Sequence, residues 1–265
     1  MPGYVKEALH QLQHHAPTKP VHAPHQWKVI QYGRAEQQPN NDDTSPKLGP
    51  EGKKHIQRIT GKFLYYARAI DHTMLVALNE LGRQQANPTE TTLEAATMLL
   101  DYAATHPHAK LRFTASDMVL HIDTDAAFLV QPQAKSRVAG YYFMGSKIVN
   151  DGVPETKLNA PILVQVKTLR YTVGSAAEAE IGGLYTGGQT AIPIRQALEE
   201  MNHTQPATPI KTDNATAKGI LTATMRPKMS KSIDKNYWWM KDKIKQGEYH
   251  LYWKKWKRKL GRLFH

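Results

Sequence analysis

The hydrophobic pattern of this chain changes its period near His106 and Pro107, and that change limits the folds open to the sequence. Before this point apolar residues recur at helical spacing, whereas after it short apolar runs typical of strands alternate with helical stretches. The first helical stripe consists of Ile56, Ile59, Phe63, Leu64, Ala67 and Ile70. We therefore expect a small helical part, a boundary near residue 115, and a second part with a mixed sheet.

The second part has the order of elements expected of a mixed α/β fold. Three antiparallel-looking strands are predicted first, then a helix from Ala176, a strand, further helices and a last strand. The β-like runs cover residues 110–113, 118–123, 137–145, 160–168, 209–213 and 249–253. Residues 16–50, rich in Pro, His, Asn and Gln, predict a linker or long surface loop. The five histidines between His10 and His25 have irregular spacing and no neighbouring carboxylate, which favours a solvated loop over a metal site.

The composition restricts the classes of function. The net charge of +12 and a pI of about 9.6 indicate a polyanionic partner such as nucleic acid, although an ordinary basic protein would have the same charge. The absence of cysteine excludes disulfides, thiolate zinc sites and cysteine nucleophiles, and fits an intracellular protein. The chain contains no apolar run of about 18 residues, so no membrane span is predicted.

Three carboxylates of the second part stand where elements begin or end. Asp123 is expected to end the first strand, Glu180 lies early in the first helix, and Asp213 ends the fourth strand. If they converge, their mutual repulsion calls for divalent cations, and oxygen ligands suit Mg²⁺ or Mn²⁺. Each also has a simpler interpretation, because Asp213 could cap the next helix, Glu180 could be a first-turn acid, and Asp125 could be a solvated strand end.

Several motifs together resemble the ribonuclease H domain of copia-type retrotransposon polyproteins. They are "HIDTDAAF", "RVAGYYFMG", "SAAEAEIGGLY", "TDNATAKG" and "SKSIDKNYWWMKDKIKQGEYHLYW". The earlier stretch "ITGKFLYYARAIDHTMLVALNELGRQQANPTETTLEAATMLLDYA" resembles the thumb and connection helices of the same polyproteins. The resemblance implies an end of palm and linker over 1–52, a thumb-like helical subdomain over 53–115, and a ribonuclease H-like mixed sheet flanked by helices over 116–265.

The resemblance also implies roles for single residues. Asp123, Glu180 and Asp213 would hold Mg²⁺ or Mn²⁺ and be catalytic, Asp125 would not be a principal ligand, and Asp234 would be structural. Tyr237, Trp238 and Trp239 match aromatic family positions, and at helical spacing these are more typical of a core than of a stacking platform. The partners implied are an RNA–DNA hybrid and an upstream reverse-transcriptase palm, with no membrane, in a cytoplasmic particle.

The sequence departs from the family pattern at two places. The paired aspartates of the polymerase are absent, so the fragment is expected not to polymerise. Gly261 and Arg262 align where the family has Ala and the fourth catalytic Asp, so cleavage is expected to be weakened. The tail remains basic and aromatic; its simpler interpretation is a solvated tail, yet its charge would still attract nucleic acid. The candidate phosphate contacts are Lys231, Lys235, Lys254, Lys255, Lys257 and Arg258.

Two functions therefore stay open at the level of sequence. The first is endonucleolytic hydrolysis of the RNA strand of an RNA–DNA hybrid by two metal ions. The second is a degenerate fragment that binds nucleic acid without cleaving it, as the substitution at Arg262 suggests. An integrase-like nuclease shares the fold but is disfavoured, because that family has no thumb-like helical domain upstream.

Overall fold

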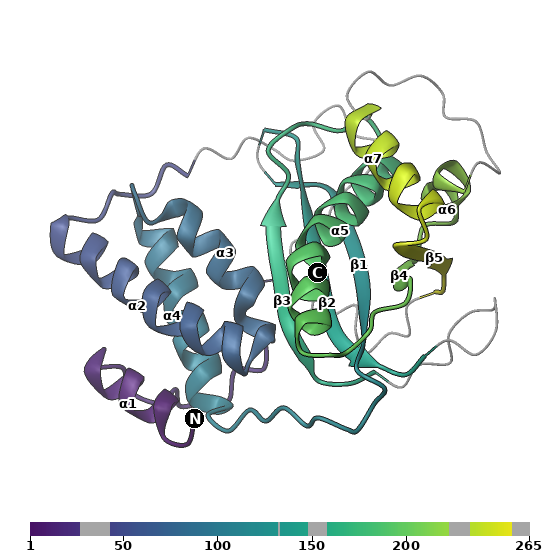
Figure 1. Cartoon of the computed structure of the whole chain (residues 1–265). Coiled ribbons are helices and arrows are strands. Elements are labelled where there is room, and N and C mark those ends of the chain that lie inside the picture. The colour runs from purple at the N-terminus through teal and green to yellow at the C-terminus, as the bar shows by residue number, and fades with distance from the viewer. Residues whose placement is uncertain (27–42, 132, 148–157, 223–233, 256–265) are drawn as a thin grey trace. The chain divides into compact units, whose positions relative to one another are not determined.

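The computed structural model describes residues 1–26, 43–131, 133–147, 158–222 and 234–255, and the chain divides into two compact units (Figure 1). The units are Met1–Leu111 and Arg112–His265, so the division falls close to the boundary expected at residue 115. Among the helices described, none is long and apolar enough to cross a membrane.

The first unit is helical. Its elements are α1 (Tyr4–Gln11), α2 (Pro50–Ala69), a 3-10 turn η1 (His72–Met74), α3 (Leu75–Gln84) and α4 (Glu90–Thr105). Most of the predicted apolar stripe is buried, with Ile56, Ile59 and Phe63 fully enclosed, whereas Leu64 and Ile70 are only partly buried.

The N-terminal segment lies in the same compact unit as these helices. The Tyr4 hydroxyl donates to the carbonyl of Lys62 at 2.9 Å. His14 Nε2 lies 2.8 Å from Asp101 Oδ1. One of the five histidines between His10 and His25 therefore has a neighbouring carboxylate, which comes from α4, far along the chain.

Helix α4 begins with a reciprocal cap. The Thr89 hydroxyl accepts a hydrogen bond from the Thr92 amide, and the Thr92 hydroxyl accepts one from the Thr89 amide. These bonds satisfy two amides that have no partner within the helix. The spacing of Thr91 and Glu94 predicts a capping box at those two residues, whereas the structure has it at Thr89 and Thr92.

The second unit contains a five-stranded mixed sheet in the order β3-β2-β1-β4-β5. Its strands are β1 (Val119–Gln131), β2 (Lys135–Gly145), β3 (Pro161–Thr168), β4 (Thr208–Thr212) and β5 (Tyr249–Trp253). The first three pair antiparallel, whereas β4 runs parallel to both β1 and β5. The predicted mixed α/β fold, a sheet flanked by helices, is confirmed.

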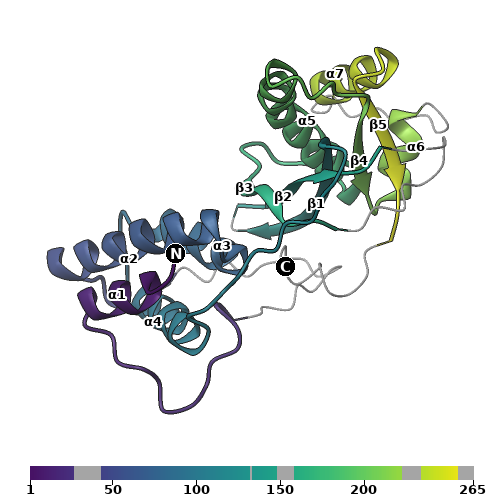
Figure 2. The same cartoon turned by 60° about the horizontal axis from the view of Figure 1, so that its bottom comes forward.

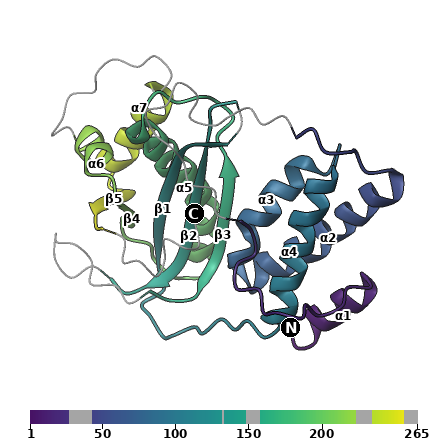
Figure 3. The same cartoon turned by 180° about the vertical axis from the view of Figure 1, so that it is seen from behind.

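Helices α5 (Ala176–Glu200) and α7 (Asp234–Lys245) lie on the same face of the sheet, and α6 (Ala215–Leu221) packs beside β4 and β5 (Figures 1 and 2). From behind, the strands lie in front of α5 (Figure 3). The core between sheet and helices includes Ile122, Leu184 and Met240.

Glycine permits the close approach of α5 to β1. A Cβ atom at Gly187 would lie 2.9 Å from Thr124 Cγ2, closer than real Cβ atoms come. The helix can therefore pack directly against β1, and its first turns lie beside the strand that carries Asp123 and Asp125.

Candidate metal centre

Asp123 and Asp125 both lie inside β1, which continues to Gln131. The expectation that the strand ends at Asp123 was wrong, because antiparallel pairing with β2 extends the strand past both carboxylates. Residues two apart on a strand point to the same face, so the two side chains share one side of the sheet. Their residues are 4% and 5% exposed, and neither is a solvated strand end.

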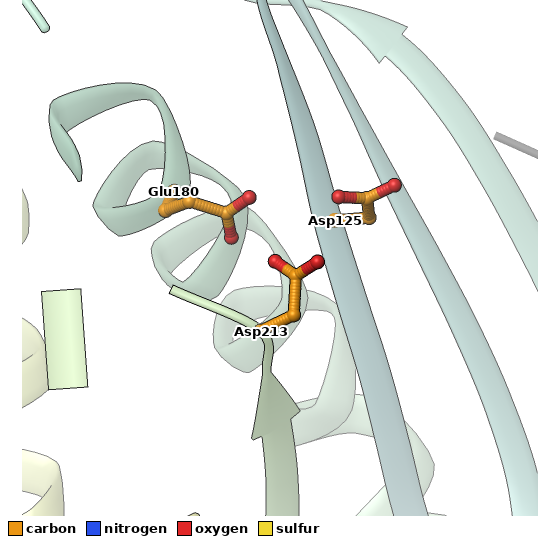
Figure 4. Close-up of side chains that lie close together, drawn as sticks. All are labelled: Asp125, Glu180 and Asp213. Carbon is orange, nitrogen blue, oxygen red and sulfur yellow. The ribbon is translucent and has the colours of Figure 1, made fainter. Parts of the chain in front are cut away.

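The structure brings Asp125, Glu180 and Asp213 together (Figure 4). Each offers a carboxylate oxygen, and these oxygens all lie within 4.8 Å of one another. They come from three elements: the middle of β1, the second turn of α5, and the residue after β4. Asp213 is more exposed than the other two, so solvent can reach the group from its side.

Glu180 is held by two hydrogen bonds. Its Oε1 accepts from the backbone amide of Ala126 at 2.9 Å, and its Oε2 accepts from the Thr212 hydroxyl at 3.3 Å. The first-turn acid of α5 is instead Glu178, whose carboxylate accepts from the Gly174 amide. Glu180 is thus fixed between β1 and β4 and is not a first-turn acid.

Asp213 lies at the turn between β4 and α6. The N-cap of α6 is Asn214, whose side chain accepts from the Ala217 amide at 2.9 Å. The capping role considered for Asp213 therefore belongs to its neighbour. Asp213 points instead toward Asp125 and Glu180 (Figure 4).

Asp123 lies outside this group, although it was expected to be one of the three metal-binding carboxylates. Its Oδ2 accepts a hydrogen bond from Lys211 Nζ at 2.9 Å, and both side chains are buried. The parallel pairing of β1 with β4 places Lys211 directly beside Asp123. The described carboxylate group therefore contains Asp125 in place of Asp123.

Burial and charge shift the titration of these acids in the metal-free protein. Burial raises the pKa of Glu180 well above its usual value of 4.5, and the nearby Asp125 and Asp213 raise it further. Burial also raises the pKa of Asp123, while the Lys211 ammonium acts to lower it. Asp123 thus has a counter-charge within the protein, whereas Glu180 faces two like charges.

The raised pKa of Glu180 predicts how the stability of the metal-free protein depends on pH. The folded state holds this proton more tightly, so it binds more protons than the unfolded state between the two pKa values. Stability should then fall as the pH rises from about 5, near the ordinary pKa of Glu, through the raised value.

Unfolding should be followed by tryptophan fluorescence, because four of the five tryptophans lie in the second unit. The stability of the wild type relative to Glu180→Gln should decrease in EDTA as the pH rises above the ordinary pKa of Glu and through the raised pKa of Glu180, since the amide does not titrate. Saturating Mg²⁺ should remove this trend. A difference in stability between the two proteins that does not change with pH would contradict the raised pKa of Glu180 as its cause.

The candidate phosphate contacts lie in several places. Lys235 Nζ is 5.5 Å from the centre of the Tyr185 ring, and the Lys254 amide donates to the Thr212 carbonyl at 3.1 Å. Lys255 is exposed after β5. Outside the described residues lie Lys231, Lys257 and Arg258, together with Gly261 and Arg262.

The aromatic run of α7 is divided between core and surface. Tyr237 is buried, and Trp239 packs against the core beneath α5. Trp238 is 59% exposed. Asp234, which was expected to be structural, is the first residue of α7.

One residue beside the carboxylates was missed by sequence reasoning. The indole Nε1 of Trp253, the last residue of β5, donates to the Asp213 carbonyl at 2.8 Å. The available signal was its position at the end of the last predicted strand, 249–253.

No protein-family model matches the chain, and no curated protein matches it. Among solved structures it is similar to the N-terminal RNase H domain of rv2228c from Mycobacterium tuberculosis, with 11% identity over 52% of this chain and 83% of that one, and a TM-score of 0.36. RNase H1 from the archaeon Halobacterium salinarum gives 10% identity over 52% and 86%, and a TM-score of 0.32.

A foamy viral protease-reverse transcriptase in complex with dsDNA is similar over 81% of this chain and 40% of its own length. Its identity is 11% and its TM-score 0.44. These three similar structures are two RNase H domains and a viral protease-reverse transcriptase. At these identities and TM-scores the likenesses carry no inference about activity.

Proposed function

We propose that this protein hydrolyses the RNA strand of RNA–DNA hybrids with divalent cations held by Asp125, Glu180 and Asp213. The observation that carries the proposal is the convergence of these three carboxylates, two of them buried, from three separate elements. Buried like charges are costly unless a cation neutralises them. Asp125 takes the place that the sequence suggested for Asp123.

The donor atoms suit the proposed ions. All three side chains offer hard oxygen ligands, which Mg²⁺ and Mn²⁺ prefer over softer metals. A pair of such ions activates a water molecule and stabilises the leaving oxygen of a phosphodiester. Glu180, fixed by Ala126 and Thr212, would orient the site, and the more exposed Asp213 would lie nearest the entering phosphate.

The sequence motifs support the choice of substrate. Their resemblance to copia-type polyproteins favours a role in reverse transcription, beside an upstream polymerase palm and within cytoplasmic particles. The net charge of +12 favours a polyanionic partner, and the 2′-hydroxyl and helical geometry of a hybrid would distinguish it from DNA.

A second candidate function is binding without cleavage. Its motivation is Arg262, which aligns where the family has its fourth catalytic Asp. A positive charge there would compete with the second cation. Binding to the hybrid would persist and would weaken steeply with salt, because lysine and arginine contacts to phosphate release counterions.

The test is cleavage of an end-labelled RNA–DNA hybrid in Mg²⁺ and in Mn²⁺, with double-stranded DNA and single-stranded RNA as comparison substrates. Cleavage of the hybrid's RNA strand that disappears in Glu180→Gln would support the enzyme. Salt-sensitive binding with no cleavage in either metal would favour the binding module, and Arg262→Asp would then be the variant to assay. Cleavage unaffected by Glu180→Gln would overturn the proposed site.

A further inference from the structure

Trp253 connects the last strand of the sheet to the carboxylate group. It is paired with Thr212 in the parallel β4–β5 ladder. From there its indole Nε1 reaches the backbone carbonyl of Asp213 at 2.8 Å. The side chain thus fastens the residue that follows β4 to the end of β5.

The turn after β4 is held by a set of bonds, and each acts on a different residue. The Lys254 amide donates to the Thr212 carbonyl at 3.1 Å, which continues the strand pairing. The Thr212 hydroxyl accepts from the Asn214 amide at 3.2 Å and donates to Glu180. The bond from Trp253 acts on the main chain of Asp213 itself, between these two anchored neighbours.

The burial of Trp253 argues against a role in packing alone. Its residue is 41% exposed, so much of the ring contributes nothing to the hydrophobic core. Trp239, by contrast, packs against the core from α7. A large side chain that stays half in solvent, with its polar atom bonded to a site residue, fits a positioning role better than a packing role.

We propose that Trp253 is a positioning residue that fixes the carboxylate of Asp213 for cation binding. The inference rests on the proposed cation site. Removing the indole N–H should let the turn rotate. The free-energy cost of placing the Asp213 carboxylate at the cation should then rise. The fold should be unaffected, because the strand pairing and the α6 cap do not use this bond.

Trp253→Phe keeps an aromatic ring but removes the donor. We expect it to bind Mn²⁺ about 3- to 10-fold more weakly, the loss expected of one ordinary hydrogen bond. The kcat for hybrid cleavage should fall similarly at subsaturating Mn²⁺, while the KM for the hybrid and the thermal unfolding midpoint stay at wild-type values. The matched control is Trp238→Phe, another exposed tryptophan on the same unit, which should behave as wild type.

A measurement on the wild-type protein tests the inference even if the Trp253→Phe variant fails to fold. In ¹H–¹⁵N spectra, the Trp253 indole resonance should shift when Mg²⁺ is added, whereas that of Trp238 should not. Wild-type Mn²⁺ affinity in a folded Trp253→Phe, or no shift of the Trp253 resonance at Mg²⁺ saturation, would overturn the inference and leave the cation site standing. No binding of Mn²⁺ by the wild type would overturn the proposed function and this inference with it.

Discussion

Replacing Asp125 with asparagine is expected to reduce hybrid cleavage by more than about 100-fold, because even residues that only support metal ligands cost 10- to 100-fold when removed. The same change should stabilise the metal-free protein by about 1 kcal/mol, since it removes one of three mutually repelling charges. Activity and stability should therefore move in opposite directions. Cleavage assays and chemical unfolding in EDTA measure the two effects.

Asp242→Asn is the matched control for this prediction. Asp242 is an exposed carboxylate of α7, away from the group, and accepts a hydrogen bond from Gln246 on the same face of the helix. Its replacement should change neither cleavage nor stability appreciably. If Asp125→Asn cleaved the hybrid at the wild-type rate, Asp125 would not be a ligand.

Replacing Asp123 with asparagine is expected to have the opposite effect on stability. The change removes the carboxylate that faces the buried Lys211 ammonium at 2.9 Å. Breaking a buried ion pair from one side costs about 3–5 kcal/mol, because the remaining charge stays in a poorly solvated place. Unfolding by urea, followed by tryptophan fluorescence, should show this loss directly.

A double variant separates the loss of the pair from other damage at this position. Asp123→Leu combined with Lys211→Met replaces both charges by apolar groups and should recover most of the stability lost in either single variant. At temperatures where it is folded, Asp123→Asn should still bind Mn²⁺. A single variant as stable as the wild type would show that the pair contributes little to the fold.

The contrast between Asp123 and Asp125 shows which features of the site could be predicted from the sequence and which could not. Helical spacing and β-like runs predicted the order of the elements and the mixed sheet, and they marked Glu180 and Asp213 as carboxylates that could converge. The choice between the two aspartates depends on what lies across from each in the neighbouring strand. Lys211, the residue that decides it, lies 88 positions further along the chain.

The other contacts that the sequence missed share this cause. The partner of His14 is Asp101 on α4, and the donor to Asp213 is Trp253, 40 positions later. Local patterns report periodicity and capping, so they do not reveal pairs formed by register and packing. Even the α4 cap, a local feature, lies at Thr89 and Thr92, two residues before the pair that the sequence spacing predicts.

The most direct test of the cation site is a calorimetric titration of Mn²⁺ into the metal-free wild type, Asp125→Asn and Asp123→Asn, each below its unfolding temperature. The arrangement of the three carboxylates predicts saturable binding at millimolar or lower Mn²⁺ by the wild type and by Asp123→Asn, and loss of that binding in Asp125→Asn. No binding by the wild type, or loss in Asp123→Asn with retention in Asp125→Asn, would contradict a metal site built from Asp125, Glu180 and Asp213.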